Sequence, residues 1–414
     1  MDMNLISLLV FVGVIALAFV CKINTGLLAV AAALILARFA GISDKALLGM
    51  FDSKMFIMLL GVMYLFCIAQ ENKTLELLAK KVLALCKGKV QLFPLLLFVL
   101  AAVLAGIGPG PISVTALMAA MTVALAKETG VHPIKLLPFA TLGAFAGGLS
   151  SITPSGIVAV TKAAENGIMG LDWPLLWKMA LTTALYGVIL YFFVFKWHKI
   201  KGAATSESEK AHAFTWKQWA TLVGIVATAL LTVLLNINVG LVGISVSVVL
   251  TAIGAADESI ALKKIPWGTL IMITGVGMLI SVVTKLGGID LLTRWLSALM
   301  NDVTASPIMC ILAGVMSWFS SASGVVMPTL IPTIPGLVES LSGVTALGLT
   351  VSLCIGAHLA ALSPLSSCGG LMLAAYSSDD SVSAKDRNKV FMQLFTISAC
   401  GVLFAALLSL VGLY

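Results

Sequence analysis

Long runs of apolar residues, separated by short polar breaks, account for most of the chain. In the first half, uninterrupted runs lie at about 4–21, 24–40, 55–70 and 173–198. Each is close to the roughly 20 apolar residues that a helix needs to cross the hydrocarbon core of a bilayer. The alternating pattern of a membrane β-barrel is absent, and backbone groups in lipid must be paired within the chain. The pattern therefore predicts an all-α polytopic membrane protein.

A polar linker at 199–217 separates two halves in which the segments follow in the same order. Adding 214 to the numbers of the first half places Gly61-Val62 on Gly275-Val276 and Gly110 on Gly324. We therefore predict two structural repeats, 1–198 and 218–414. The second half has apolar runs at 218–235, 238–256, 267–283 and 388–412, and the amphipathic stretches are 73–89 in the first half and 287–300 in the second.

Each half also contains two apolar segments that are interrupted. Glycines and prolines at 106–111 break the first of them, and a polar run at 150–156 breaks the next. We predict a re-entrant hairpin followed by a broken helix in each repeat. Such a repeat has five full crossings, and an odd number inverts the second repeat relative to the first. The hairpins are expected at about 91–127 and 306–342, and the broken helices at about 134–165 and 344–376.

Composition and charge narrow the class further. Hydrophobic residues make up 60% of the chain and charged residues 10%, against about 45–50% and 25% in soluble domains, so a soluble globule is excluded. Of the 25 Lys and Arg residues, 18 fall on one side of the predicted spans. By the positive-inside rule that side is cytoplasmic, which predicts an inner (plasma) membrane protein with both termini extracytoplasmic. The net charge of +7 therefore reflects topology, and we expect no nucleic-acid partner. The seven cysteines show no CxxC pair and are interpreted as small buried hydrophobes.

Candidate chemistry is concentrated at the four breaks in the helices. A half-helix N-terminus presents amides that suit an anion, and a half-helix C-terminus presents carbonyls that suit a cation. Capping and small-residue helix packing are the structural alternatives for the same residues. The candidates are Gly108, Gly110, Ser113 and Thr115 at the first hairpin tip; Ser150, Ser151, Thr153, Ser155 and Gly156 at the first break; Ser321, Ser323, Gly324 and Thr329 at the second tip; and Ser363, Ser366, Ser367, Cys368 and Gly369 at the second break.

Two further side chains stand out. His358 lies inside a span and could carry a coupling proton or bind an anion, although a buried histidine satisfied by a backbone carbonyl is the alternative. Lys162 and Glu165 are three residues apart after the first break, so they predict either a surface ion pair or an anion-attracting residue at the mouth of the site.

The motif Gly147-Gly148-Leu149-Ser150-Ser151-Ile152-Thr153-Pro154-Ser155-Gly156 and the tip Ser113-Val114-Thr115 resemble the ion transporter superfamily. Within it, they are most similar to the divalent anion:sodium symporters and the MatC-type dicarboxylate carriers. The resemblance implies a scaffold with a moving transport domain, elevator-type alternating access, a homodimer, and a substrate held between two hairpin tips and two broken helices.

In the symporters each tip carries Ser-Asn-Thr, whose Asn contacts a substrate carboxylate and whose neighbourhood binds sodium. Here Val114 stands where Asn is expected, and the second tip, near Ser321-Ala322-Ser323, also lacks Asn. The resemblance favours sodium, near Ser113, Thr115 and Ser323, whereas the missing asparagines and His358 favour protons.

The sequence thus predicts a secondary active transporter that imports small organic dianions such as malonate, succinate or malate, without a cofactor. A proton-coupled or exchange carrier for a tricarboxylate, sulfate or another organic acid is the alternative, and an anion channel is a further one. Ionisable groups are nearly absent from the spans and no Walker motif is present, so neither an enzyme nor an ATP-driven pump is expected.

Overall fold

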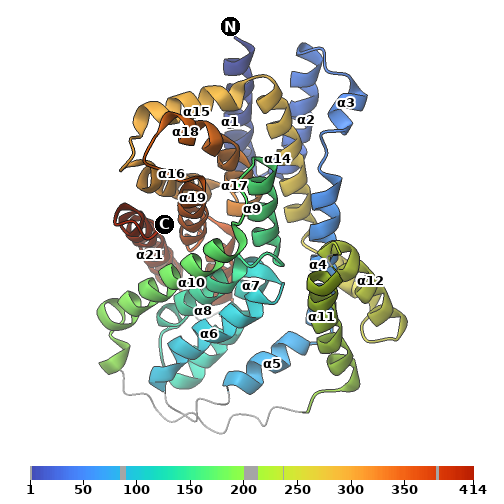
Figure 1. The fold of residues 1–414 in the computed structure, drawn as a ribbon. Coiled ribbons are helices and arrows are strands. Elements are labelled where there is room, and N and C mark those ends of the chain that lie inside the picture. Colours follow the sequence, from blue (N-terminus) through green and yellow to red (C-terminus); the bar gives the residue numbers. More distant parts are fainter. Residues whose placement is uncertain (1, 84–89, 200–212, 236, 379–381) are drawn as a thin grey trace.

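The computed structural model describes residues 2–83, 90–199, 213–235, 237–378 and 382–414 (Figure 1). Within these ranges every regular element is a helix, which confirms the all-α prediction. Most of the predicted linker at 199–217 and the end of the amphipathic stretch at 73–89 lie outside the described residues. Seven helical stretches in the described chain are long and apolar enough to cross a membrane: Met3–Cys21, Asp44–Glu71, Gly110–Lys127, Asp172–Val194, Trp267–Lys285, Ala322–Ser340 and Ala384–Leu410.

The helices of the first half follow the predicted order closely. They are α1 (Met3–Cys21), α2 (Thr25–Phe39), α3 (Asp44–Leu48), α4 (Ser53–Glu71), α5 (Thr74–Leu83), η2 (Val90–Leu92), α6 (Phe93–Gly106), α7 (Gly110–Thr129), η3 (Pro133–Lys135), α8 (Leu137–Gly148), α9 (Pro154–Glu165), α10 (Asp172–Ile189), η4 (Leu190–Val194) and η5 (Trp197–Lys199). Helices α6 and α7 form the first hairpin, and α8 and α9 form the first broken helix.

The second half repeats this order. Its elements are α11 (Trp216–Leu235), α12 (Val239–Ala252), α13 (Glu258–Lys264), α14 (Trp267–Lys285), α15 (Gly288–Leu299), α16 (Ala305–Phe319), η6 (Ala322–Val326), α17 (Met327–Leu330), η7 (Ile331–Thr333), α18 (Ile334–Ser340), α19 (Ala346–Ala360), α20 (Ser367–Ser377) and α21 (Ala384–Leu410). The amphipathic helices α5 and α15 lie at opposite ends of the molecule (Figure 1). The opposite membrane orientation of the two halves stays a prediction.

Helix starts recur at the same positions in both halves. The Asn24 side chain accepts a hydrogen bond from the Gly26 amide at 2.9 Å, and Asn238 accepts one from the Gly240 amide at 3.0 Å. Each asparagine thereby satisfies one of the unpaired amides at the start of its helix. Short capped helices, α3 and α13, also occupy corresponding places, and the sequence pattern did not predict them.

Glycines allow the two halves to pack against each other at backbone distance. Helix α4 packs against α12, and α2 packs against α14. A Cβ atom on Gly61 would collide with the backbone of Gly240, and one on Gly275 would collide with the backbone of Gly26. The two contacts are equivalent, because the offset of 214 that aligns the sequences takes Gly61 to Gly275 and Gly26 to Gly240. Side chains at these positions would force the helices apart.

Two predicted segments differ from the observed ones. The run 173–198 is not a continuous helix, because α10 widens into the π-helical turn η4, and Lys196 then adopts a positive φ of 51°. The buried Trp197 indole donates to the Lys135 carbonyl at 3.1 Å, which fixes the chain beyond that turn. The returning arm of the second hairpin is divided into η6, α17, η7 and α18, since its prolines cannot donate helical hydrogen bonds.

Candidate functional site

The first hairpin tip packs directly on the first break. Gly108 and Gly110 both have positive φ, of 145° and 74°, a conformation that glycine adopts without steric cost. A Cβ atom on Gly108 would collide with the Phe66 ring of α4, and one on Gly110 would lie 3.0 Å from Cδ of Pro154. The glycines predicted as binding residues therefore let bare backbone lie between α4 and the start of α9.

Several candidate hydroxyls are used to hold the breaks together. Thr153 caps α9, because its Oγ1 accepts from the Gly156 amide at 3.1 Å and lies 2.7 Å from the Gly148 carbonyl oxygen. Ser321 accepts from the Gly324 amide at 3.1 Å in the same way. In these residues the geometry matches the capping alternative. Thr329 donates to the Val325 carbonyl at 2.6 Å, and Ser363 accepts from the Leu365 amide at 3.2 Å.

The two breaks have the same construction. A Cβ atom on Gly156 would collide with the Ser150 carbonyl, and one on Gly369 would collide with the Ser363 carbonyl. Each glycine lies in the first turn of the half-helix that follows its break, α9 or α20. In both half-helices the first turn therefore packs at backbone distance against the preceding loop. The first backbone amides of each half-helix lie at the break.

Other candidate hydroxyls make no side-chain hydrogen bond in the described part of the chain. Ser366 is the N-cap residue of α20 but its side chain does not cap the helix, and its neighbour Ser367 is exposed. Ser155 and Ser323 are buried, Ser113 and Ser150 are half-buried, and Ser151 is exposed. These side chains remain available to a ligand at the starts of α9, α20, α7 and η6.

Thr115 is the most isolated of the candidates. It is 1% exposed, and apart from the Cys368 thiol its hydroxyl has no hydrogen-bond partner within the described residues. Helix α7 packs against α20, so that Thr115 lies beside the Cys368 thiol in the first turn of α20. The first hairpin thus brings a buried hydroxyl with only a thiol as its partner to the N-terminus of α20, the second half of the second broken helix.

His358 lies in the packed interior between α8 and α19. Its Nδ1 is 2.9 Å from the Cys354 carbonyl oxygen, so the Nδ1–H tautomer donates to that oxygen. Its ring contacts the Phe145 ring edge-on, with centroids 5.8 Å apart, and the residue is 3% exposed. This geometry fits the alternative of a histidine satisfied by a backbone carbonyl.

Lys162 forms the predicted pair with Glu165, at 2.7 Å, and a second ion pair that the sequence did not reveal. Its Nζ is also 3.1 Å from Oδ2 of Asp52. Asp52 is the N-cap residue of α4, so this contact joins α9 to the start of α4. The two residues are 110 positions apart, which is why no local spacing rule could have paired them.

His132 connects the loop after α7 to the end of α20. Its Nδ1 accepts from the Ile134 amide at 3.3 Å, and its Nε2 lies 3.5 Å from the Tyr376 hydroxyl. Burial lowers the pKa of His132, and the neighbouring charges act on it as well, Lys389 and Lys135 lowering the pKa and Asp386 raising it. The neutral ring is therefore favoured, in agreement with its role as an acceptor.

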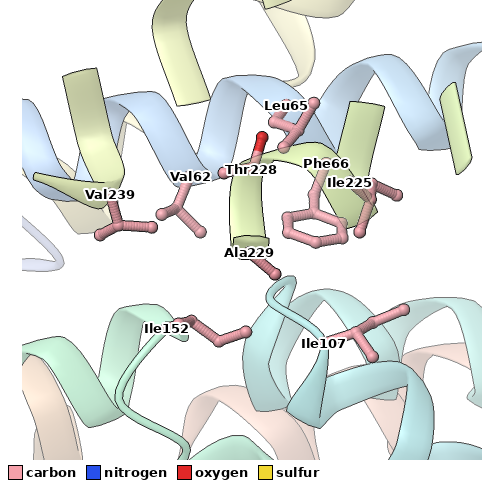
Figure 2. Close-up of a pocket in the computed structure, with 9 residues that line it drawn as sticks. All are labelled: Val62, Leu65, Phe66, Ile107, Ile152, Ile225, Thr228, Ala229 and Val239. Carbon is pink, nitrogen blue, oxygen red and sulfur yellow. The ribbon is translucent and has the colours of Figure 1, made fainter. Parts of the chain in front are cut away.

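A small apolar cavity lies between the first hairpin tip, the first break and the helices α4 and α11. Figure 2 shows Ile107 of the hairpin tip and Ile152 of the first break facing Phe66 of α4 and Ala229 of α11. The cavity encloses about 20 Å³, room for about one water molecule. Its one hydroxyl, from Thr228, already donates to the Gly224 carbonyl. The cavity is therefore a gap in the packing between helices and does not suit a polar substrate.

Taken together, the apolar helices and the four interrupted segments define a polytopic α-helical membrane protein with a transporter-like fold. Residues 1–148 match a family model described as the N-terminus of the dicarboxylate carrier protein MatC. The predicted resemblance to MatC-type carriers is thus confirmed over that part of the chain. No curated protein matches the chain. The crystal structure of the YdaH transporter from Alcanivorax borkumensis, which has an unusual topology, is similar over 89% of both chains, with a TM-score of 0.59 and 12% identity. At that identity the similarity concerns the fold alone.

Proposed function

We propose that this protein is a secondary active transporter that imports small organic dianions, with C3 or C4 dicarboxylates such as malonate, succinate or malate as its substrates. A cation gradient drives the uptake, and the hairpins and broken helices move as an elevator against the remaining helices. The cation is sodium, bound near Ser113, Thr115 and Ser323. The working form is a homodimer in the inner membrane, with two inverted repeats and both termini outside the cytoplasm.

One observation carries this proposal: the buried hydroxyl of Thr115 in α7, which lies against the start of α20 with only the Cys368 thiol, a weak hydrogen-bonding group, as its partner among the described residues. Leaving a buried hydroxyl without a partner costs about 1–3 kcal/mol, and a carboxylate oxygen would accept its hydrogen bond. The first-turn amides of α20 carry partial positive charge, which favours the same ligand. The free hydroxyl of Ser366 lies at the same helix end.

The comparisons support the same class of substrate and protein. The matched family model is named after a dicarboxylate carrier, and the similar solved structure is a transporter. A proton-coupled or exchange carrier for another anion is the alternative, with the proton on His358 or on the substrate's own carboxyl. The packing of His358 against a backbone carbonyl favours sodium over that alternative.

Uptake into proteoliposomes tests the proposal. Labelled succinate or malonate is supplied with an inward sodium gradient in one set and an inward proton gradient in another. Sodium-driven uptake with saturable counterflow is expected, because a carrier exchanges bound substrate and a channel does not. Uptake driven by protons alone would refute the coupling, and no uptake of either acid would refute the substrate class.

The variant Thr115→Ala should raise the KM for succinate by about tenfold to a hundredfold, the value of one hydrogen bond to a charged group. Thr122→Ala is the matched control, because Thr122 is also buried and unpartnered and lies two turns further along α7. Its KM should stay unchanged. An equal effect of both substitutions would assign Thr115 to helix packing and remove it from the site.

A further inference from the structure

An apolar groove runs along the outside of the molecule between α6 and α10, away from the candidate substrate site. Its volume is about 330 Å³, within the range of small-molecule ligand pockets. It is lined by the start of α6, by α8 and by the end of α10: Gln91, Leu92, Pro94, Leu95, Phe98, Phe139, Ala184, Gly187, Val188, Tyr191 and Phe192.

The groove is lined by a glycine with open space at its Cβ position and by the distorted helical turn η4. A Cβ atom on Gly187 would meet no atom within 4 Å, although the residue itself is buried. One turn later α10 widens into η4, and the Tyr191 hydroxyl donates to the Gln91 carbonyl at 3.3 Å. Such π-helical turns occur frequently at functional sites.

The walls of the groove face outward and are hydrocarbon. Leu95 is 59% exposed, Val188 50% and Phe192 47%, and Asp172–Val194 is one of the helical stretches suited to crossing a membrane. In a bilayer such a surface is filled by acyl chains, since water would gain no hydrogen bonds from it. The shape therefore suits a lipid chain that lies along α10.

Basic side chains at one end of the groove favour a ligand with a negative charge. The His198 ring lies 5.6 Å from the Phe192 ring, and both His198 and Lys196 are exposed just beyond η4. The half-buried Lys135 is held nearby through its carbonyl, which accepts from Trp197. The three segments that line or adjoin the groove, 90–98, 133–140 and 184–198, contain no Asp or Glu. Basic pockets of this kind at a membrane surface attract anionic lipid headgroups.

We propose that this groove is a binding site for an anionic phospholipid, with an acyl chain over Gly187 and the headgroup phosphate beside Lys196 and His198. The site is separate from the substrate site and does not depend on the transported substrate. It places a lipid between α6 of the first hairpin and α10, which both pack on α8.

Native mass spectrometry of the delipidated full-length protein, titrated with phosphatidylglycerol or with phosphatidylcholine of the same chains, tests the proposal. The wild type should bind one phosphatidylglycerol more tightly than any phosphatidylcholine. Gly187→Leu fills the floor and should abolish that binding. Gly13→Leu in α1 is the matched control, because a Cβ atom there also meets no atom within 4 Å, and binding should persist.

Lys196→Ala should weaken phosphatidylglycerol binding about fivefold, the contribution of one lysine to an anionic lipid surface, and leave phosphatidylcholine unchanged. If Gly187→Leu is not monodisperse, Ala184→Leu replaces it, since Ala184 lines the same groove. Unchanged lipid binding in the folded groove-filling variant would overturn the proposal. Equal binding of both lipids by the wild type would overturn it too, because it would indicate non-specific boundary lipid only.

Discussion

The ion pair between Lys162 and Asp52 joins α9 to the start of α4, and the effect of breaking it on stability can be predicted quantitatively. Asp52 uses its two oxygens differently: Oδ1 accepts from the Met55 amide at 2.9 Å, and Oδ2 faces Nζ of Lys162 at 3.1 Å. In Asp52→Asn the amide oxygen can keep the cap, but an NH₂ group then faces the lysine ammonium. The substitution thus removes the ion pair while the helix start is preserved.

Burial sets the size of the expected effect. The Lys162 and Asp52 side chains are 14% and 19% exposed, whereas the Glu165 side chain is 45% exposed. Breaking a fully buried pair costs about 3–5 kcal/mol, and an exposed pair contributes about 0–1 kcal/mol. Because Glu165 still neutralises the lysine, we expect Asp52→Asn to cost about 2 kcal/mol, which corresponds to a fall in Tm of about 2–4 °C for a chain of this length.

Thermal unfolding of the purified protein in detergent, followed by tryptophan fluorescence, measures this shift. Glu165→Gln is the control and should change the Tm by less than about 1 °C, since it removes the more exposed pair. The Asp52→Asn shift should persist in high salt, because a mostly buried pair is poorly screened. A Tm lowered equally by both variants, or by neither, would refute the argument from burial.

Two further predictions concern packing and pH. Gly61→Ala should destabilise the protein by about 1–3 kcal/mol, because the new Cβ atom would collide with the Gly240 backbone. Gly277→Ala should be neutral or stabilising, because its Cβ atom would meet no atom within 4 Å. Thermal unfolding of the two variants measures the difference, and equal shifts in Tm would contradict the close contact between Gly61 and Gly240. Since the pKa of His132 is lowered in the folded state, the unfolded chain binds the proton more readily, and stability should fall as the pH drops below about 6.5. His132→Asn should reduce this loss of Tm between pH 7 and pH 5, and an identical pH dependence in the variant would show that other groups cause it.

Segment boundaries were predictable because glycine, proline and polar runs interrupt the apolar pattern wherever the chain turns. The break at 150–156 and the tip at 106–111 span the junctions between observed helices for that reason. The division of the second returning arm was missed, although Pro328, Pro332 and Pro335 mark it in the sequence. An apolar run need not form one continuous helix, and hydrophobicity alone does not show where it divides.

The candidate site was only partly predictable, because spacing along the chain does not show which hydroxyls are already bonded. Thr153 and Thr115 look alike in sequence, yet Thr153 caps a helix and Thr115 has no partner in the described structure other than the Cys368 thiol. Contacts between segments far apart in the sequence, such as Lys162 with Asp52, depend on packing that local patterns do not contain. In membrane segments this difficulty grows, since lipid-facing and interior positions are both apolar.

The paired glycine contacts between α2 and α14 and between α4 and α12 have a consequence for how the protein is made. Gly26 and Gly61 lie against backbone that is synthesised more than 170 residues later, at Ile271 and Gly240. Until the second half has been translated, the glycine-lined faces of α2 and α4 therefore lack the helices against which they pack. Neither half can complete this packing alone, so the contact between α2 and α14 can form only after the α14 segment has been synthesised.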